Sequence, residues 1–206
     1  MPTSLFDIQR LQVIRKLALL VAIMAVTALA LVTRSTWGEG DFHEIVEAVG
    51  LGMIAICIVG RAWCSLYIGG RKKAEIVDRG PYSISRNPLY VFSFIGAFGI
   101  GAQTGSATLA LLFLLVTAAV FWFTVQREEA WLLNAFGRPY ADYKARVPRF
   151  GPDLSKWRDE GTLEIRPVFF LTTLRDGLVM LLAIPLFESI EKLQGIGWLA
   201  PLIHLP

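Results

Sequence analysis

The sequence is poor in charged residues and in cysteine. Asp, Glu, Lys and Arg make up 18% of its 206 residues, whereas soluble domains carry about a quarter. The two cysteines, Cys57 and Cys64, share one helix face of an apolar segment but are too far apart along the axis for a disulfide. The chain has no CxxC or Cys/His ligand pattern. We therefore expect two packing cysteines, no disulfide framework and no metal.

The apolar residues gather in long blocks. They make up 54% of the chain, and the mean hydropathy is +0.53. Because the blocks show no stripe of period 3.6, lipid is the expected surrounding of most helices. The expected spans are residues 17–33, 48–70, two within the uncharged stretch 87–125 with a turn at GIGAQTGS (99–106), and 167–187. The sequence therefore predicts an all-α fold, a polytopic membrane helix bundle of about five transmembrane helices.

Basic residues mark one side of this expected bundle. The net charge is only +3, so the global charge says little, and no nucleic-acid partner is expected. Arg and Lys are concentrated before the first span, after the second, and in the polar segment 126–166. The loop between the first two spans is acidic. The positive-inside rule then places the N-terminus and the basic segments on the cytoplasmic side, of the inner membrane if the source is bacterial. Both polar segments share that side and can build one site.

Three charged residues fall inside expected spans. Arg61 stands toward one end of the second span, where it can reach the interface or a partner. Arg175 and Asp176 are adjacent in the middle of the fifth span. A charge at membrane depth is costly, so we expect this pair to face the protein interior and to pair, or to serve a site.

The stretch RGPYSISRNPLY, residues 79–90, begins the third span. Gly80-Pro81 predicts a turn, and Asn87-Pro88 predicts a helix start with Asn at the N-cap and Pro at the first helical position. The N-terminus of such a helix presents free N–H groups to an anion. A helix start alone does not explain the polar and aromatic side chains gathered around it, which are Tyr82, Arg86 and Tyr90. The stretch is therefore a candidate binding site.

A second stretch, REEAWLLNAFGRPYADYKARVPRF, covers residues 127–150. It carries an apolar and aromatic stripe at spacings of three and four, formed by Leu132, Phe136, Tyr140, Tyr143 and Val147. Gly137 and Pro139 interrupt this stripe, so we expect two short helices joined at Gly137. The adjacent carboxylates Glu128 and Glu129 follow the fourth span, and one of them can turn toward the bundle.

The two stretches together resemble the isoprenylcysteine carboxyl methyltransferases and the related phospholipid methyltransferases. These integral membrane enzymes use S-adenosylmethionine. Their pattern is GPY-x-x-x-R-[HN]-P-x-Y, then a hydrophobic hairpin, then EE and FG-x-x-Y-x-x-Y-x-x-R-V-P, and it covers residues 76–152 here. The length suits one membrane domain over residues 1–206, and the resemblance covers only its catalytic half. We expect a two-helix N-terminal region (residues 1–75), a catalytic region (residues 76–166) and a C-terminal helix and tail (residues 167–206).

The resemblance also implies roles for individual residues. The cofactor pocket would be lined by Arg86, Asn87, Pro88, Tyr90 and Tyr140. Glu129 would bind the amino group of the cofactor, with Glu128 as the less favoured choice. Substrate would meet the catalytic candidates Tyr143 and Arg146. Arg127 is a further catalytic candidate from its charge and not from the resemblance. Asn87 occupies the position where the family usually has His, and an amide cannot act as a base.

The acceptor is expected to be a lipidic molecule that enters from the bilayer. A carboxylate is already ionised at neutral pH and needs no base, so Asn87 favours carboxyl methylation of an isoprenylcysteine-like acceptor. An Arg would then match the carboxylate oxygens, with Arg146, Arg127 and Arg175 as candidates. The alternatives are N-methylation of a phospholipid headgroup amine, an NADPH-dependent membrane reductase, and a membrane protein that is not an enzyme. The oligomeric state stays open.

Overall fold

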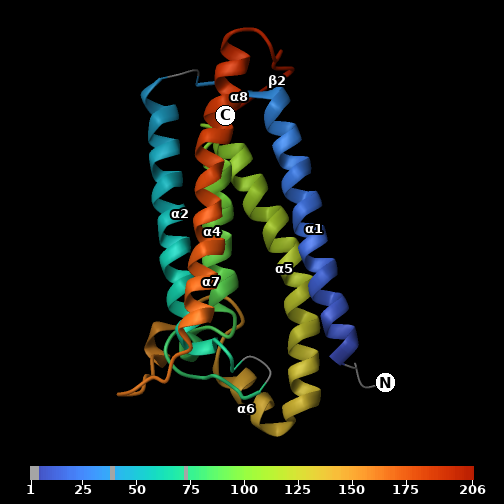
Figure 1. The fold of residues 1–206 in the computed structure, drawn as a ribbon, viewed down its shortest axis with the longest axis vertical. Coiled ribbons are helices and arrows are strands. Elements are labelled where there is room, and N and C mark those ends of the chain that lie inside the picture. The colour runs from blue at the N-terminus through green and yellow to red at the C-terminus, as the bar shows by residue number, and fades with distance from the viewer. Residues whose placement is uncertain (1–4, 38–39, 72–73) are drawn as a thin grey trace.

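The structure is a computed structural model that describes residues 5–37, 40–71 and 74–206. It is an all-α bundle (Figure 1), which confirms the expected fold class. The helices are α1 (Leu5–Val32), α2 (Asp41–Ile68), α3 (Pro81–Ile84), α4 (Pro88–Ala102), α5 (Ala107–Phe136), α6 (Arg138–Arg146), α7 (Pro167–Leu178) and α8 (Ala183–Gly195). Two 3-10 turns, η1 (Leu154–Lys156) and η2 (Val179–Leu182), and two short strands, β1 (Thr33–Ser35) and β2 (Ile203–Leu205), complete the described elements.

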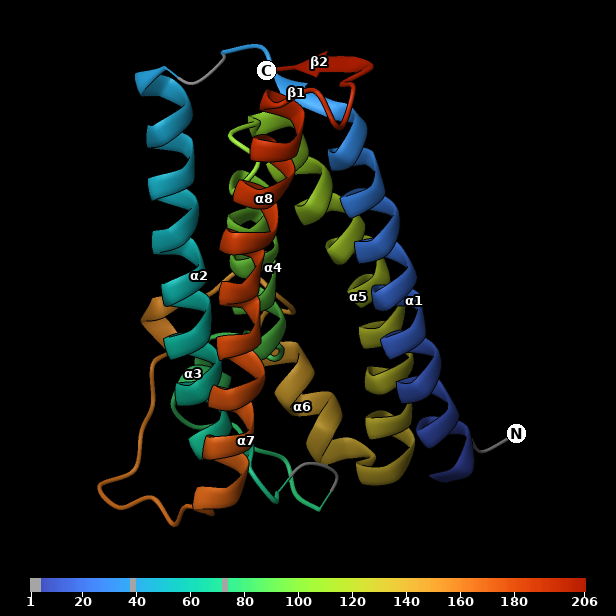
Figure 2. The same cartoon turned by 45° about the horizontal axis from the view of Figure 1, so that its top comes forward.

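The long helical segments run between the two ends of the bundle. α2 packs on both α4 and α7, α4 packs on α5, and α5 packs on α1. The run α7–η2–α8 stands beside α2 and α4, whereas α5 and α1 lean away from it toward the end that carries α6 (Figures 1 and 2). We call that end, formed by residues 74–87 and 137–166, the polar end. At the opposite end β1 and β2 pair in parallel, which the sequence did not predict.

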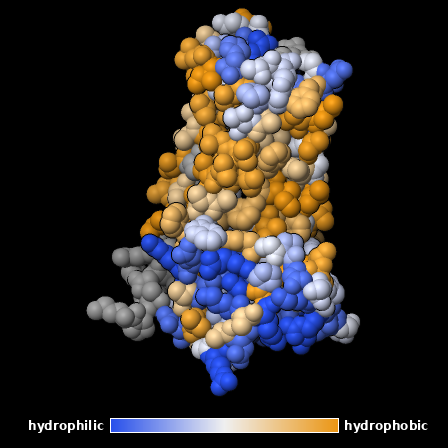
Figure 3. Space-filling view, turned by 180° about the vertical axis from the view of Figure 1, so that it is seen from behind, coloured by the Kyte–Doolittle hydropathy of each residue, from blue (hydrophilic) through white to orange (hydrophobic). Residues whose placement is uncertain are grey.

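The surface of the bundle fits a membrane. Figure 3 shows a broad apolar belt between two polar ends. Helices α2 and α5 and the run 167–195 are each long and apolar enough to cross a bilayer, and residues 23–32 and α4 form shorter apolar helices. The chain is therefore built as a membrane protein. The expected five crossings and the cytoplasmic orientation stay predictions.

The turn between α4 and α5 and the junction of α5 and α6 lie where the sequence signals predicted, whereas α1 and α2 begin earlier than the expected spans. α4 and α5 are joined by residues 103–106, inside the expected turn. Gly137, with a φ of 60°, ends α5 and precedes α6, so the predicted junction is right. The first of the two expected short helices is instead the continuous end of α5, which is 30 residues long. A residue with a side chain adopts positive φ only at a cost, so glycine suits this junction. Cys57 and Cys64 are both buried and form no disulfide, as expected for packing residues.

The expectation that Arg175 and Asp176 face the interior is wrong. Their side chains are 77% and 56% exposed, and they pair only with each other, at 3.2 Å, among the described residues. The buried face of α7 is instead marked by Gly177, which lies against Ile58 of α2. Since neighbouring residues on a helix point in different directions, packing through Gly177 turns the two charges outward.

Candidate functional site

The two sequence stretches meet at the polar end through a ladder of hydrogen bonds. The backbone N–H of Gly80 donates to the Arg158 carbonyl at 2.7 Å, and the N–H of Arg86 donates to the Pro148 carbonyl at 2.9 Å. The Asn87 amide nitrogen donates to the Arg149 carbonyl at 3.2 Å. The segment before α4 and the segment after α6 therefore hold each other in place, so that both contribute to one site.

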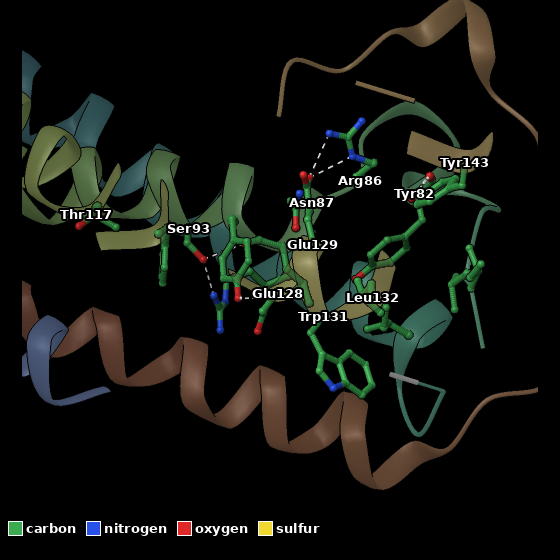
Figure 4. Close-up of a pocket in the computed structure, with 18 of the residues that line it drawn as sticks. Tyr82, Arg86, Asn87, Ser93, Thr117, Glu128, Glu129, Trp131, Leu132 and Tyr143 are labelled. Atoms are coloured by element: carbon green, nitrogen blue, oxygen red, sulfur yellow. Dashed lines mark hydrogen bonds and ion pairs between the residues drawn. The ribbon is translucent and has the colours of Figure 1, made fainter. Parts of the chain in front are cut away.

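A buried carboxylate joins the two stretches electrostatically. Glu129, near the end of α5, is only 3% exposed. Its Oε1 lies 3.0 Å from Nη2 of Arg86, and its Oε2 lies 2.9 Å from Nη2 of Arg149 and 3.8 Å from Nζ of Lys144. Figure 4 shows Arg86 reaching Glu129 across the site. The carboxylate thus contacts three cations and connects α5 to both polar stretches.

Two tyrosines of α6 pack in the polar end, and one of them connects α6 to α3. Tyr140 and Tyr143 are buried with Val147 in one hydrophobic cluster, as the aromatic stripe predicted. The Tyr143 hydroxyl donates to the Tyr82 carbonyl of α3 at 2.8 Å. Burial raises the pKa of the Tyr140, Tyr143 and Tyr82 phenols above their usual range. These hydroxyls therefore stay protonated at neutral pH, as hydrogen-bond donors rather than bases.

A cavity of about 450 Å³ opens beside these residues and runs up between the helices. This volume lies within the usual range of ligand sites. In Figure 4, Tyr82 and Tyr143 stand at one end of the lining, Glu128 and Asn87 in the middle, and Ser93 and Thr117 toward the other end. The part inside the bundle is mostly apolar, and its lining includes Ile23, Phe113, Thr117, Phe121 and Met180.

The structure brings most of the predicted site residues together in this lining. They are Arg86, Asn87, Tyr90, Glu129, Tyr140 and Tyr143. Pro88 is buried at the start of α4. Arg127 and Arg146 lie outside the cavity as the described residues define it, since Arg127 is exposed and Arg146 is an exposed partner of Asp78 at 3.4 Å. Their contact with a substrate stays a prediction.

Asn87 has a different local role from the one expected. It occupies the N-cap position of α4, but its side chain makes no capping hydrogen bond in the described helix. The amide donates to the Arg149 carbonyl instead. The Ser85 hydroxyl accepts from the Asn87 N–H at 3.3 Å. The predicted helix start with Asn87 at the N-cap position is therefore right, but the Asn87 side chain is turned toward the Arg149 carbonyl and makes no capping bond.

The sequence missed three residues that the structure adds to the site. Arg149 is the second cation on Glu129, and its guanidinium lies 5.1 Å from the centre of the Trp122 ring. Arg61 and Ser93 line the part of the cavity inside the bundle, where the Arg61 guanidinium donates to the Ser93 hydroxyl. The sequence identified Arg61 as a charged residue inside an apolar span, but it could not predict which helix the Arg61 side chain faces.

The polar end suits S-adenosylmethionine by the chemistry of its side chains. That molecule carries a carboxylate, an ammonium, a sulfonium and an adenine ring. The lining offers a cation in Arg86, carboxylates in Glu128 and Glu129, and aromatic rings in Tyr90 and Tyr140. Glu129 is surrounded by cations, and the neighbouring Glu128 carboxylate also lines the cavity and accepts from the Tyr90 hydroxyl at 3.0 Å.

A separate group of ligating atoms lies at the end opposite the polar end. Nε2 of His43 lies 3.4 Å from a Glu47 oxygen and 3.2 Å from a Glu191 oxygen. The three potential ligand atoms lie within 4.8 Å of one another. A tetrahedral zinc site with bonds of about 2.0 Å would space its ligand atoms by about 3.3 Å. This group joins α2 to α8.

Comparisons with known proteins point in two directions. The phospholipid methyltransferase family matches residues 48–139. The chain is 35% identical over 185 residues to the nickel-cobalt-cadmium resistance protein NccN of Alcaligenes xylosoxydans xylosoxydans, covering 89% of this chain and 86% of NccN. It is 32% identical to the cobalt-zinc-cadmium resistance protein CzcN of Cupriavidus metallidurans over 90% and 85% of the two chains.

A third relative is named for its enzymatic activity. The protein-S-isoprenylcysteine O-methyltransferase of Schizosaccharomyces pombe is 34% identical over 95 residues, which cover 46% of this chain and 40% of that enzyme. No solved structure matches the chain.

Proposed function

Because the chain belongs to the family of isoprenylcysteine and phospholipid methyltransferases, we propose that it transfers a methyl group from S-adenosylmethionine to a lipidic acceptor. The most favoured reaction is carboxyl methylation of an isoprenylcysteine-like acceptor, and the alternative is N-methylation of a phospholipid headgroup amine. The observation that carries the proposal is the cavity that joins the Arg86–Glu129–Tyr140 cluster to the apolar interior of the bundle.

The polar end is the proposed cofactor site. When bound there, S-adenosylmethionine supplies an electrophilic methyl group on a sulfonium. Glu128 would pair with the ammonium, and the N-terminus of α4 would face the carboxylate. Arg86 would hold Glu129 at the edge of the site, since its guanidinium already contacts Glu129 and the Lys144 and Val147 carbonyls. Tyr90 and Tyr140 would pack on the adenine or face the sulfonium. Since no side chain of the lining has to form a bond, the protein would act mainly by holding two molecules in line.

The apolar part of the cavity is the proposed acceptor site. Its wall includes Phe113, Phe121 and Met180, which suit a hydrocarbon tail. With Asn87 in the place of an imidazole and protonated tyrosines nearby, the described lining favours an acceptor that is already ionised. A carboxylate meets this condition at neutral pH, whereas an amine must first lose a proton.

Titration of the detergent-solubilised protein with S-adenosylhomocysteine tests the cofactor site. We expect saturable heat at a stoichiometry of one. Glu128→Gln removes the charge opposite the ammonium while leaving the Glu129 cluster intact, and it is expected to weaken binding by about tenfold or more, because a charge-assisted hydrogen bond contributes about 1.5–3 kcal/mol. Arg127→Gln, on an exposed position one residue before, is the matched control and should bind as the wild type does.

Binding by the wild type that Glu128→Gln leaves unchanged would remove Glu128 from the cofactor site. A well-folded wild type that produces no heat would refute the proposed function itself. If binding is found, radiolabelled methyl transfer to N-acetyl-S-farnesylcysteine and to phosphatidylethanolamine separates carboxyl from amine methylation, because the ester product releases volatile methanol in base and the amine product does not.

A second candidate function is a part in resistance to divalent transition metals. The names of the two relatives that match most of this chain favour it. His43, Glu47 and Glu191 would contact the ion, since imidazole and carboxylate are ligands that cobalt, nickel and zinc accept. Expression in a cobalt-sensitive bacterial host is expected to raise the tolerated cobalt concentration several-fold.

Two variants separate the ways in which such resistance could arise. If metal contact carries it, His43→Ala abolishes the gain and Glu128→Gln keeps it. If methyl transfer carries it, the pattern is reversed. Unchanged tolerance with the wild-type chain, expressed at a level confirmed by immunoblot, would exclude the second candidate for this chain acting alone.

A further inference from the structure

Arg61 is a half-buried cation without a countercharge in the described structure. It lies on α2, seven residues before the end of the helix at Ile68, which is about 10 Å along the axis. Among the described residues its guanidinium makes one hydrogen bond, to the Ser93 hydroxyl, and no carboxylate lies within ion-pair distance. Its Nε is buried without a partner there. An arginine stays charged at any accessible pH, so this site suits an anion.

Ser93 holds the Arg61 guanidinium in place at the cavity wall. It is 5% exposed on α4, and its hydroxyl donates to the Leu89 carbonyl at 2.7 Å while accepting from Arg61. That arrangement fixes the hydroxyl and directs Arg61 toward the cavity wall of α4. Both residues line the cavity. In Figure 4, Ser93 lies between Thr117 and Glu128, and a dashed line marks its hydrogen bond.

The position of the pair along the cavity sets what it can bind. Ser93 is six residues beyond Asn87 on α4, about 9 Å toward the middle of the bundle. It therefore stands between the polar end and the apolar part lined by Phe113 and Met180. A molecule with its tail in the apolar part would bring its head group to Arg61. The arginines expected from sequence to meet a carboxylate, Arg127, Arg146 and Arg175, are all exposed.

We propose that Arg61, oriented by Ser93, forms an oxyanion subsite that binds the carboxylate or phosphate of an amphiphilic acceptor, beside the cofactor. The proposal rests on the proposed function for the identity of the bound molecule as an acceptor. The planar guanidinium matches two oxygens of either group. The low dielectric of the apolar wall strengthens the attraction between the guanidinium and an anion. Charged side chains inside a membrane are costly and usually mark a functional site. Arg61 thus selects anionic amphiphiles over neutral ones.

The test compares amphiphiles that share one tail. The full-length protein is placed in phosphatidylcholine nanodiscs, and tetradecanoate, tetradecyl phosphate and tetradecanol compete against a fluorescent fatty acid. We expect at least one anion to compete at a mole fraction about tenfold or more below that of tetradecanol. A preference for tetradecanoate identifies a carboxylate acceptor, and a preference for tetradecyl phosphate identifies a phospholipid.

Variants assign the preference to the subsite. Arg61→Met is expected to abolish the preference for the anionic amphiphile over tetradecanol. Arg61→Lys is expected to retain part of this preference, because lysine keeps the charge but cannot form the bidentate hydrogen bonds of arginine. Arg175→Met removes an exposed arginine of a neighbouring apolar helix and is the matched control that should change nothing. Ser93→Ala leaves the charge of Arg61 in place and should weaken anion binding by a smaller factor than Arg61→Met does. If Arg61→Met fails to fold, Ser93→Ala still tests the subsite.

Any of three results would overturn the subsite. They are equal competition by tetradecanol and both anions in the wild type, a preference that persists in folded Arg61→Met, and an equal loss of preference in Arg175→Met. S-adenosylhomocysteine titration of the same samples keeps the two proposals apart. Loss of cofactor binding in Arg61→Met with anion preference intact would move Arg61 to the cofactor site, whereas a wild type without cofactor binding refutes the methyltransferase and leaves the anion comparison valid.

Discussion

Glu129→Gln is expected to destabilise the polar end and to abolish binding of S-adenosylhomocysteine. The substitution removes the negative charge from Arg86 and Arg149 while keeping the size of the side chain. The side chain of Arg86 is 8% exposed and that of Glu129 is 3% exposed. Breaking a buried ion pair by removing one partner costs about 3–5 kcal/mol, because the remaining charge is left without compensation. The loss should appear as a lower thermal unfolding midpoint in detergent.

Glu128→Gln is the matched control for this effect. The two carboxylates are adjacent on α5, but Glu129 is buried against Arg86 and Arg149, whereas Glu128 is half-buried and accepts from the Tyr90 hydroxyl. Glu128→Gln should therefore weaken cofactor binding with an unchanged unfolding midpoint, and Glu129→Gln should lower both. Equal midpoints for the two variants would contradict the role of Glu129 in holding the polar end together.

A double variant shows whether the cost comes from the charge. Arg149→Met removes one of the cations that Glu129 compensates and also the ring contact with Trp122. If the Glu129–Arg149 pair is the origin, Glu129→Gln combined with Arg149→Met should lose less stability than the sum of the single variants. Strict additivity would mean that the two residues do not interact energetically.

The parts of the fold that follow from local signals were predictable. Long apolar runs predicted α2, α4 and α5, because a helix is the way to satisfy backbone groups in lipid. Gly137 predicted the junction of α5 and α6, because a positive φ favours glycine. The meeting of the two polar stretches followed from the two spans between them, which return the chain to the same end. None of these inferences requires knowing which face of one helix packs against another helix.

The parts that depend on which helix face meets which neighbour were not predictable. Arg175 points outward because Gly177 supplies the contact with α2. No sequence pattern shows which of these two residues of α7 faces α2. Glu129 is neutralised by Arg149 because α6 returns the chain over the end of α5. Arg61 belongs to the cavity because α2 and α4 pack closely, which brings Ser93 within reach.

That close packing depends on glycine, and Gly50→Val is expected to disrupt it. A Cβ on Gly50 of α2 would lie 2.9 Å from the Gly99 carbonyl oxygen of α4 and 2.7 Å from Cβ of Ala102. These are backbone or short side-chain atoms that cannot swing aside, so the helices must separate. Overpacking of this kind costs about 1–3 kcal/mol, and a rigid neighbour favours the upper end. The thermal unfolding midpoint should fall accordingly.

Gly52→Val is the matched control, because a Cβ on Gly52 would have no described atom within 4 Å. Its midpoint should equal or exceed that of the wild type. Gly50→Ala with Ala102→Gly should lose less stability than Gly50→Ala alone, since the second change removes one of the close contacts. Because α2 carries Arg61 and α4 carries Ser93, separation of these helices should also weaken anion binding about as much as Ser93→Ala does. Equal midpoints for Gly50→Val and Gly52→Val would mean that α2 and α4 are not packed through this face.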